Sequence, residues 1–143
     1  MILCDVNVLV NAFREDAKDH ELYKDWLLGK LNGEEPVCHH GVIDSGFIRI
    51  VTHQRIFQPP SDPELAFQFL RDIRGAANAA PIDVGARHWE IFERLCGDAS
   101  ARGNLVPDAY IAALAIEAGA TLYSADRGFA RFPGLRWIHP LDE

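Results

Sequence analysis

The stretch ILCDVNVLVNAF, residues 2–13, is the part of the sequence that best indicates the fold. Three apolar residues lead directly into Asp5, Asn7 follows, and apolar residues then resume. The first part is typical of a short buried strand, and the second of a helix that begins at once. A carboxylate placed directly after a buried strand would be poorly solvated on its own. We therefore expect Asp5 to belong to a functional site.

Strand-like and helix-like segments alternate along the rest of the chain. Alternation of this kind predicts an α/β fold with a mainly parallel central β-sheet. The length of 143 residues fits one domain, which we expect to span residues 1–143. The expected strands are residues 1–5, 35–40, 79–83, 121–126 and 135–140, and the expected helices are residues 6–15, 19–33, 41–53, 63–75, 85–100 and 108–119.

The spacing of apolar residues predicts which helix faces are buried. In the helix expected at residues 41–53, Ile43, Phe47 and Ile50 lie on one side. In the helix expected at residues 19–33, the buried side is predicted to be Leu22, Trp26 and Leu27. In the helix expected at residues 85–100, it is predicted to be Trp89, Phe92 and Leu95.

The composition limits the class of protein. Apolar residues make up 48% of the chain, which excludes a disordered protein, and no apolar run approaches the roughly 18 residues that span a bilayer. No signal peptide is recognisable after Met1. Cys4, Cys38 and Cys96 are odd in number and too scattered for a disulfide or zinc set. We therefore expect a cytoplasmic protein with free thiols.

The formal net charge of −7 argues against nucleic-acid binding through bulk electrostatic attraction alone. It is compatible with an enzyme that binds nucleic acid through a local basic rim and divalent ions. It is equally compatible with a basic partner segment. Composition does not separate these two possibilities.

Four aspartates fall where a parallel sheet would gather them. Asp5 and Asp126 end predicted strands, Asp108 follows Pro107 in the first turn of the Ala-rich helix, and Asp44 lies early in the helix after the second strand. The carboxyl ends of parallel strands share one edge of the sheet, so we expect a common cleft there. Two carboxylates ~4 Å apart repel by about 4 kcal/mol at an effective dielectric near 20, and a divalent cation removes this cost.

The residue types around these acids favour a hard cation. Oxygen ligands without nearby histidine or cysteine select Mg²⁺ or Mn²⁺ over zinc. Asn7 and Ser124 can hydrogen-bond the carboxylates and fix their rotamers. Three of the acids also have a structural explanation, because Asp108 can cap a helix, Asp126 can be a turn residue and Asp44 can be a solvated helix residue.

Three stretches resemble the PIN-domain family, and specifically the VapC-type toxins of bacterial toxin–antitoxin pairs. They are LCDVNVLVNAF, GFIRIVTHQRIF and LVPDAYIAALAIEAGATLYSADRGFARFPGLRWIHP, in that order and spacing, within residues 2–140. The third is the most specific, because an acid, an Ala-rich helix, a strand, SAD and FARFPGL recur together. The resemblance implies a single PIN-like domain with a parallel sheet, helices on both faces and a site for Mg²⁺ or Mn²⁺.

By this resemblance, Asp5, Asp108 and Asp126 are the catalytic and metal-binding residues, with Asn7 and Ser124 as polar neighbours. The implied activity is hydrolysis of RNA phosphodiester bonds, with a 5′ phosphate and a 3′ hydroxyl as products. The implied partners are a cognate VapB-type antitoxin, the RNA substrate and a second copy of the chain. Candidates for phosphate contacts, each of which could equally be an ordinary surface residue, are Arg49, Arg55, Arg127 and Arg131.

One position departs from the family pattern. Many PIN domains carry a glutamate, as E-L-x-R, in the helix after the second strand, where this chain reads Gly46-Phe47-Ile48-Arg49. Asp44 is the nearest acid and the candidate replacement as a metal ligand. Two residues along a helix correspond to a rotation of about 200°, so Asp44 fits only if this helix begins late or irregularly.

Other classes remain as alternatives. A phosphatase of the haloacid dehalogenase type also has an aspartate after its first strand, but its second acid is replaced here by Asn7. A response-regulator receiver needs a lysine late in the sheet, and the lysines here all lie within the first 30 residues. A PIN-like binding module that lacks catalysis would account for Gly46.

Overall fold

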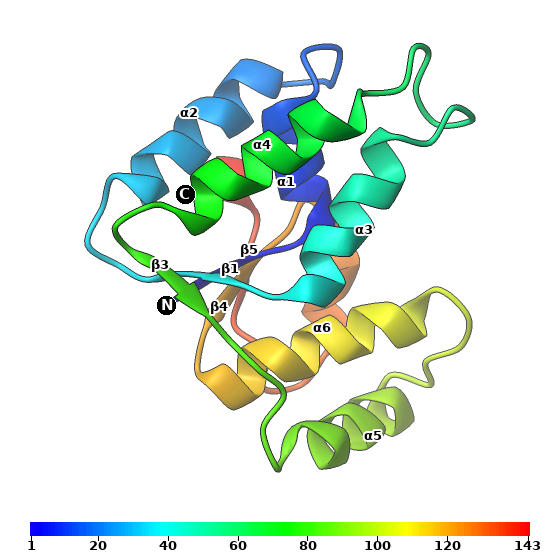
Figure 1. The fold of residues 1–143 in the computed structure, drawn as a ribbon. Helices are drawn as coiled ribbons and strands as arrows, with labels where there is room; N and C mark the ends of the chain where they lie inside the picture. Colours follow the sequence, from blue (N-terminus) through cyan, green and yellow to red (C-terminus); the bar gives the residue numbers. More distant parts are fainter.

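The chain folds around a parallel sheet of short strands, which the computed structural model describes together with every other part of residues 1–143 (Figure 1). All four strand pairings are parallel, as the alternation predicts. The strand order is β3-β2-β1-β4-β5, and the strands are β1 (Ile2–Cys4), β2 (Val37–His39), β3 (Ala79–Pro81), β4 (Thr121–Tyr123) and β5 (Trp137–Ile138).

The strand order reverses between β1 and β4. The chain first adds β2 and β3 on one side of β1, and then β4 and β5 on the other. Cys4 at the end of β1 lies opposite Tyr123 at the end of β4, so both strands leave the sheet at the same level. In open parallel sheets, ligands bind beyond the carboxyl ends of the strands at such a reversal point.

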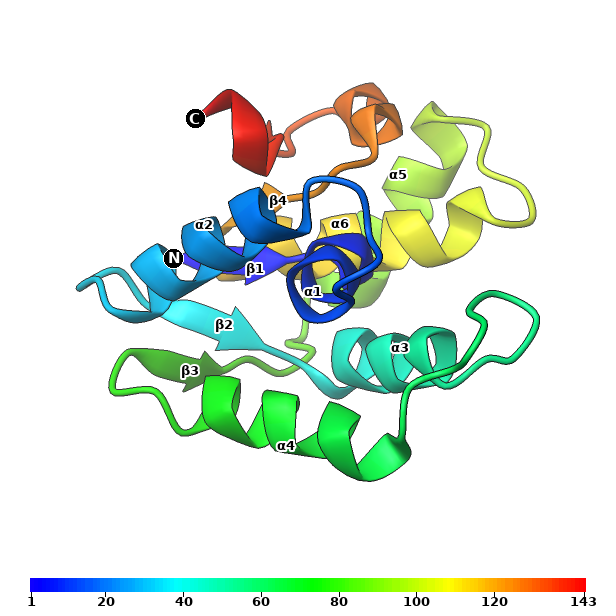
Figure 2. The ribbon, with the colours of Figure 1, turned by 90° about the horizontal axis from the view of Figure 1, so that it is seen from above.

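Helices cover both faces of the sheet, which confirms the predicted fold class. In Figure 1, α2 and α4 lie on one side and α5 and α6 on the other, and Figure 2 shows α1 between α2 and α3. No helix combines the length and the apolar character that crossing a membrane requires. The helices are α1 (Val6–Phe13), α2 (His20–Leu31), α3 (Gly41–Val51), α4 (Pro63–Arg74), α5 (His88–Asp98) and α6 (Leu105–Ala118), with short 3₁₀ turns η1 (Arg127–Arg131) and η2 (Pro140–Asp142).

The core is built around β1 and α6. Ile2 and Leu3 of β1 are fully buried, and the five consecutive residues 111–115 of α6 are all buried, so the middle of this helix is enclosed on every side. The alanines of α6 bring its backbone close to the sheet, because their side chains occupy little space. Gly119 ends α6 with a left-handed backbone (φ 69°), a conformation that costs glycine little.

Two predicted helix faces are wrong by one residue. Trp89 is 67% exposed, whereas its neighbour His88 is 1% exposed and occupies the inner face of α5. The buried His88 ring is accommodated because its Nε2 lies 3.0 Å from the carbonyl oxygen of Tyr110, within hydrogen-bonding distance. In α2, Leu22 is likewise exposed and Tyr23 is buried. A prediction that gives inner positions only to aliphatic and Trp side chains misses His88 and Tyr23.

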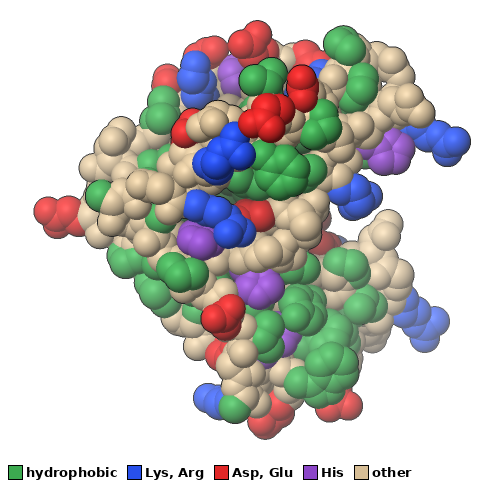
Figure 3. All heavy atoms as spheres, viewed as in Figure 1, with side chains coloured by type: hydrophobic (Ala, Val, Ile, Leu, Met, Phe, Trp, Pro, Cys, Tyr) green, Lys and Arg blue, Asp and Glu red, His purple; other side chains and the backbone are tan.

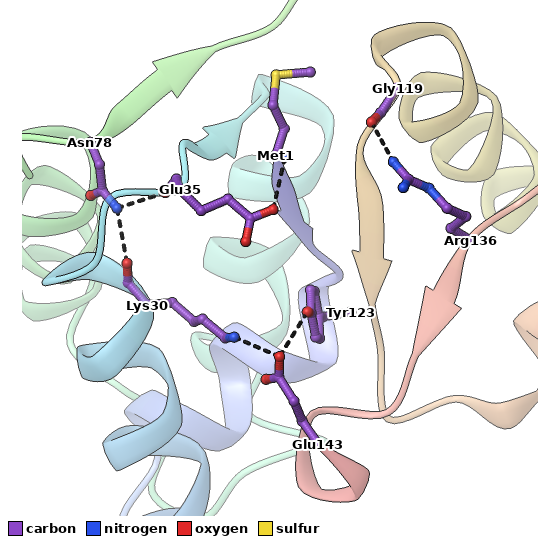
Figure 4. Close-up of polar contacts among 8 residues, drawn as sticks. All are labelled: Met1, Lys30, Glu35, Asn78, Gly119, Tyr123, Arg136 and Glu143. Atoms are coloured by element: carbon purple, nitrogen blue, oxygen red, sulfur yellow. Dashed lines mark hydrogen bonds and ion pairs between the residues drawn. The ribbon is translucent and has the colours of Figure 1, made fainter.

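The last residue of the chain, Glu143, is held by side chains of α2 and β4. Glu143 accepts hydrogen bonds from Lys30 Nζ at 2.7 Å and from the Tyr123 hydroxyl at 3.2 Å (Figure 4). At the other terminus, the Met1 amino group contacts Glu35 at 2.9 Å. These contacts tie the C-terminal residue to α2 and β4, and the N-terminal amino group to the segment before β2.

Candidate active site

Asp5 lies between a strand and a helix and serves both. Its backbone N–H donates to the Tyr123 carbonyl at 2.9 Å, which extends the pairing of β1 with β4. Its side chain caps α1, where Oδ1 accepts the Val6 N–H at 2.8 Å. A negative charge is favoured at a helix N-terminus by the aligned peptide dipoles. Asp5 is only 7% exposed, so its orientation is fixed.

Ser124 joins the end of β4 to the end of β1 through one buried hydroxyl. Its Oγ donates to Asp5 Oδ2 at 2.7 Å and accepts from the backbone N–H of Asp126 at 3.0 Å. Asn7 Nδ2 donates to Asp5 Oδ2 at 2.9 Å and to Ser124 Oγ at 3.0 Å. Asn7 Oδ1 accepts the Ala125 N–H at 3.0 Å. The hydrogen bonds predicted from Asn7 and Ser124 are therefore present, and both are made to Asp5.

Asp126 and Asp108 come from two further segments. Asp126 lies three residues beyond β4 and begins η1, where its Oδ1 accepts the Gly128 N–H at 2.8 Å. It is therefore a turn residue that also faces the site. Asp108 lies in the first turn of α6, which begins at Leu105 and not at Asp108 as predicted. The N-cap of α6 is Asn104, and the Asp108 side chain makes no hydrogen bond or ion pair within the chain, so both of its carboxylate oxygens are free for another partner.

The three aspartates line one cavity of about 570 Å³ beyond the carboxyl ends of β1 and β4. The molecule is hollowed here between α3 and α6 (Figure 3). The cavity contains no histidine or cysteine, and much of its wall is apolar. The residues that complete the wall are Val6, Asn7, Val10, Asn11, Val42, Gly46, Arg49, Ile50, Phe92, Val106, Pro107, Tyr110 and Ile111.

The carboxylates are close enough to disturb each other's ionisation. Burial, together with the charges of Asp5 and Asp126, raises the pKa of Asp108 to about 6, while the charge of Arg131 opposes the rise. Burial also raises the pKa of Asp5, and the charge of Asp126 adds to this. Hydrogen bonds from Ser124, Val6 and Asn7 work in the opposite direction at Asp5. Without a counterion, the cavity therefore concentrates unfavourable negative charge.

A hard divalent cation fits this donor set. Asp5 Oδ1 accepts a single hydrogen bond, so it retains a lone pair for a metal. No three acidic, histidine or cysteine side chains converge closely enough to enclose an ion by themselves. Mg²⁺ does not need such a cage, because it keeps several waters and is usually bound by one or two carboxylates together with substrate phosphates. The geometry suits an open, hydrated site.

Comparison with known proteins identifies the family. The PIN domain model matches residues 2–135. The chain belongs to the PIN-domain family. The VapC ribonuclease Mb2897 of Mycobacterium bovis is 45% identical over 142 residues, which are 99% of this chain and 97% of that protein. Ribonuclease VapC25 of Mycobacterium tuberculosis is 36% identical over 140 residues, or 98% of this chain and 99% of that protein. Within the family, this PIN domain is therefore a member of the VapC group.

Solved structures agree with this fold. VapBC2 from Rickettsia felis, crystallised with a DNA fragment from its promoter, matches with a TM-score of 0.70 at 19% identity, over 97% of this chain and 98% of that one. FitAB bound to an IR36 DNA fragment matches with a TM-score of 0.67 at 20% identity, over 98% of this chain and 95% of that one. Membership of the PIN family excludes the two alternatives of a haloacid dehalogenase-type phosphatase and a response-regulator receiver.

Asp44 does not belong to the site of this PIN domain, contrary to the prediction that it replaces the family glutamate. Asp44 Oδ2 accepts hydrogen bonds from Arg74 Nε at 2.8 Å and Nη2 at 2.6 Å. It faces α4 and lines a separate cavity between α3 and α4. Helix α3 begins regularly at Gly41, so the rotation of about 200° between Asp44 and Gly46 points the two positions to different sides.

The Asp44–Arg74 pair predicts a stability effect that is unrelated to catalysis. Asp44 is buried, so Arg74→Ala leaves its carboxylate without a charged partner. We expect the free energy of unfolding, measured by urea denaturation, to fall by about 1.5–3 kcal/mol. The matched control is Arg71→Ala on the same helix, whose Glu64 partner is exposed, and we expect a loss below about 1 kcal/mol. Equal losses in the two variants would contradict this role for Arg74.

Two of the four candidate arginines reach the site. Arg49 lines the cavity, and Arg131 lies close enough for its charge to lower the pKa of Asp108. Arg127 instead pairs with Asp142 at 2.9 Å, and Arg55 lies exposed in the loop after α3, away from the cavity. Arg127 and Arg55 are therefore ordinary surface residues in this structure.

Gly46 faces the cavity at the position of the family glutamate. A Cβ atom added at Gly46 would lie 3.1 Å from Val6 Cγ2, which is tighter than ordinary packing. Glycine therefore lets α3 approach the first turn of α1. A glutamate at this position would require Val6 to shift, and the cavity has three aspartates without a fourth acid from α3.

Several residues of the cavity wall are not predicted from the sequence. Asn11 lies one helical turn after Asn7 on α1, and this spacing of four residues is the signal that could have indicated it. Phe92 and Tyr110 come from α5 and α6. No local pattern indicates them, because their position depends on how these two helices pack.

Proposed function

We propose that this chain is a metal-dependent endoribonuclease that hydrolyses RNA phosphodiester bonds in the cavity lined by Asp5, Asp108 and Asp126. The observation that carries the proposal is the meeting of these three acids, from three segments, in one cavity at the reversal point of the sheet. The chain is also 45% identical to a VapC ribonuclease over nearly its whole length. Residues 1–143 act as one catalytic unit.

The acids have distinct roles in this proposal. Asp5 and Asp108 bind Mg²⁺ or Mn²⁺ directly, and Asp126 binds a second ion or orients the attacking water. A bound ion supplies polarisation of the phosphate, activation of water and stabilisation of the leaving 3′ oxygen. Ser124 and Asn7 hold the Asp5 carboxylate in one rotamer, so no reorientation is needed when the ion and substrate arrive.

The basic side chains at the cavity position the substrate. Arg49 on the α3 side and Arg131 on the η1 side contact phosphates of the RNA, which fixes its register without reading its sequence. Attack on the phosphorus leaves a 5′ phosphate and a 3′ hydroxyl. We expect the enzyme to act on this RNA in the cytoplasm.

The proposed protein partners are a cognate VapB-type antitoxin and a second copy of the chain. The antitoxin is inferred from membership of the VapC group. The acidic cavity would suit a basic segment of the antitoxin that occupies it in place of RNA. Co-purification with the product of the adjacent reading frame, and sedimentation of the isolated chain, test these two partners separately.

The test is cleavage of total cellular RNA by the purified protein, free of antitoxin. We expect discrete cuts in the presence of Mg²⁺ or Mn²⁺, and sequencing of new 5′-phosphate ends would locate them. EDTA and the Asp5→Ala variant should each abolish the cuts. If wild type and Asp5→Ala leave the RNA equally intact, the catalytic proposal fails and the binding module with Gly46 in place of glutamate replaces it.

A further inference from the structure

Three aromatic side chains connect the surface of α5 with the active cavity. Trp89 is 67% exposed and packs against Phe92, with ring centroids 5.4 Å apart and planes at 65°. Phe92 packs in turn against Tyr110 at 5.5 Å and 71°. Phe92 and Tyr110 both line the cavity that contains Asp108. A continuous run of rings therefore leads from solvent to the carboxylates, and hydrophobic side chains gather over α5 in Figure 3.

Trp89 is not needed to pack α5 against the domain. The inner face of α5 is formed by His88, Ile91 and Leu95, all of them buried. The indole N–H groups of Trp26 and Trp137 donate to protein oxygens at 2.8 and 3.1 Å, whereas that of Trp89 donates to none. An exposed tryptophan with no structural task is available to a ligand.

The charge of the protein favours a ligand held partly by stacking. The net charge is −7, and Arg49 and Arg131 are the candidate arginines near the cavity, so stacking would add affinity to what these charges supply. Aromatic side chains bind unpaired bases through their faces, which needs no positive charge. Bases in a regular duplex are already stacked and cannot be bound in this way.

We propose that Trp89, supported by Phe92, is a stacking platform for an unpaired base of the RNA that flanks the scissile phosphate. This inference rests on the proposed ribonuclease function and makes single-stranded or looped RNA the preferred substrate class. Trp89 contacts Phe92 of the cavity wall, so a base stacked on Trp89 would lie at the rim of the cavity that holds the carboxylates. Trp89 is the only large exposed hydrophobic residue on α5, so the patch offers a base-sized surface and not the roughly 800 Å² per partner of a stable protein interface.

The experiment measures RNA binding without cleavage, in an Asp5→Asn background and without divalent ions. The probe is a labelled single-stranded RNA of about 12 nucleotides, with the matching duplex as a second probe. Trp89→Ala should weaken single-strand binding by about fivefold to a hundredfold. Trp89→Phe should retain most of the affinity, because it keeps an aromatic face. Trp89→Leu should behave like Trp89→Ala, because it keeps only apolar surface.

Salt dependence separates stacking from charge. Trp89→Ala should lower affinity without changing the slope of log affinity against log salt, whereas Arg49→Ala should reduce that slope. The matched control is Leu65→Ala on α4, also an exposed apolar residue at 62%, which should leave binding unchanged. Thermal unfolding of each variant confirms that it is folded.

Several outcomes would overturn the platform. They are a Trp89→Ala variant that binds like Leu65→Ala, a Trp89→Leu variant as good as Trp89→Phe, and equal loss for single strand and duplex. If Trp89→Ala loses a dimer in sedimentation and Trp89→Leu keeps it, the patch is a protein interface and not a base platform. If wild type fails to cleave RNA, the proposed function fails, while the binding comparison still decides the role of Trp89.

Discussion

Replacing Asp108 with asparagine is expected to abolish RNA cleavage and, at neutral pH, to stabilise the ion-free fold. The carboxylate of Asp108 is a proposed metal ligand, and loss of the several kcal/mol that a metal contributes corresponds to about a thousandfold in rate. The same carboxylate is repelled by Asp5 and Asp126 and is partly buried, which is why its pKa rises to about 6. Removing the charge relieves this repulsion.

The sign of the pH dependence follows from the raised pKa. An unfolded aspartate ionises near its model value of 3.8, and folded Asp108 near 6. The cost of ionising it in the fold is absent below the lower value, grows between the two and is complete above the higher one. The difference corresponds to about 3 kcal/mol at most, and solvent screening of this partly exposed group reduces it to about 1 kcal/mol.

Thermal unfolding as a function of pH measures this effect. Wild type without divalent ions should lose stability relative to Asp108→Asn as the pH rises from about 4 to about 6. Asp98→Asn on exposed α5 should follow wild type. Adding Mg²⁺ should stabilise wild type and not Asp108→Asn, because only wild type retains the ligand. A variant that is less stable than wild type at neutral pH, or fully active, would contradict this role for Asp108.

Ser124→Ala should weaken metal binding although Ser124 touches no ion. Its hydroxyl holds Asp5 Oδ2 at 2.7 Å and accepts the Asp126 N–H, so one buried atom orients two of the acids. Loss of such an outer contact typically costs about 10–100-fold in metal affinity or activity. The pKa of Asp5 should rise further, because the hydrogen bond from Ser124 lowers it. The free energy of unfolding should fall by about 1–3 kcal/mol, because the Asp126 N–H loses its partner.

Calorimetric titration with Mn²⁺ and the rate of RNA cleavage measure this effect together. Ser45→Ala, at an exposed position on α3, is the control and should bind the ion as wild type does. If folded Ser124→Ala binds Mn²⁺ with wild-type affinity and cleaves RNA at the wild-type rate, the link from Ser124 through Asp5 has no functional importance.

Local sequence patterns predicted the sheet edge well because strand ends need only short-range information. Asp5, Asn7, Ser124 and Asp126 lie within three residues of the end of β1 or β4, and the parallel pairing of these strands brings them together. Asp108 was placed by its position near the start of an apolar helix. These positions follow from where buried segments stop, which apolar runs mark clearly.

Positions that depend on the rotation and packing of helices were predicted less well. Asp44 was a candidate ligand by sequence proximity, but the regular start of α3 turns it toward Arg74. Trp89 was assigned to a buried face because it is apolar, whereas His88 takes that place through its hydrogen bond to Tyr110. Such side-chain partners come from distant segments, so no local spacing reveals them.

The most direct test of the central claim is Mn²⁺ binding by wild type and by Asp5→Ala, Asp108→Asn and Asp126→Asn at neutral pH, with Asp98→Asn as the control. The claim is that Asp5 and Asp108 bind a divalent ion directly, with Asp126 acting beside them in the same cavity. It predicts losses of affinity for Asp5→Ala and Asp108→Asn that exceed the roughly 10–100-fold of an outer-shell residue, a measurable loss for Asp126→Asn, and none for the control. Wild-type affinity in Asp5→Ala and Asp108→Asn, with both variants folded, would contradict it.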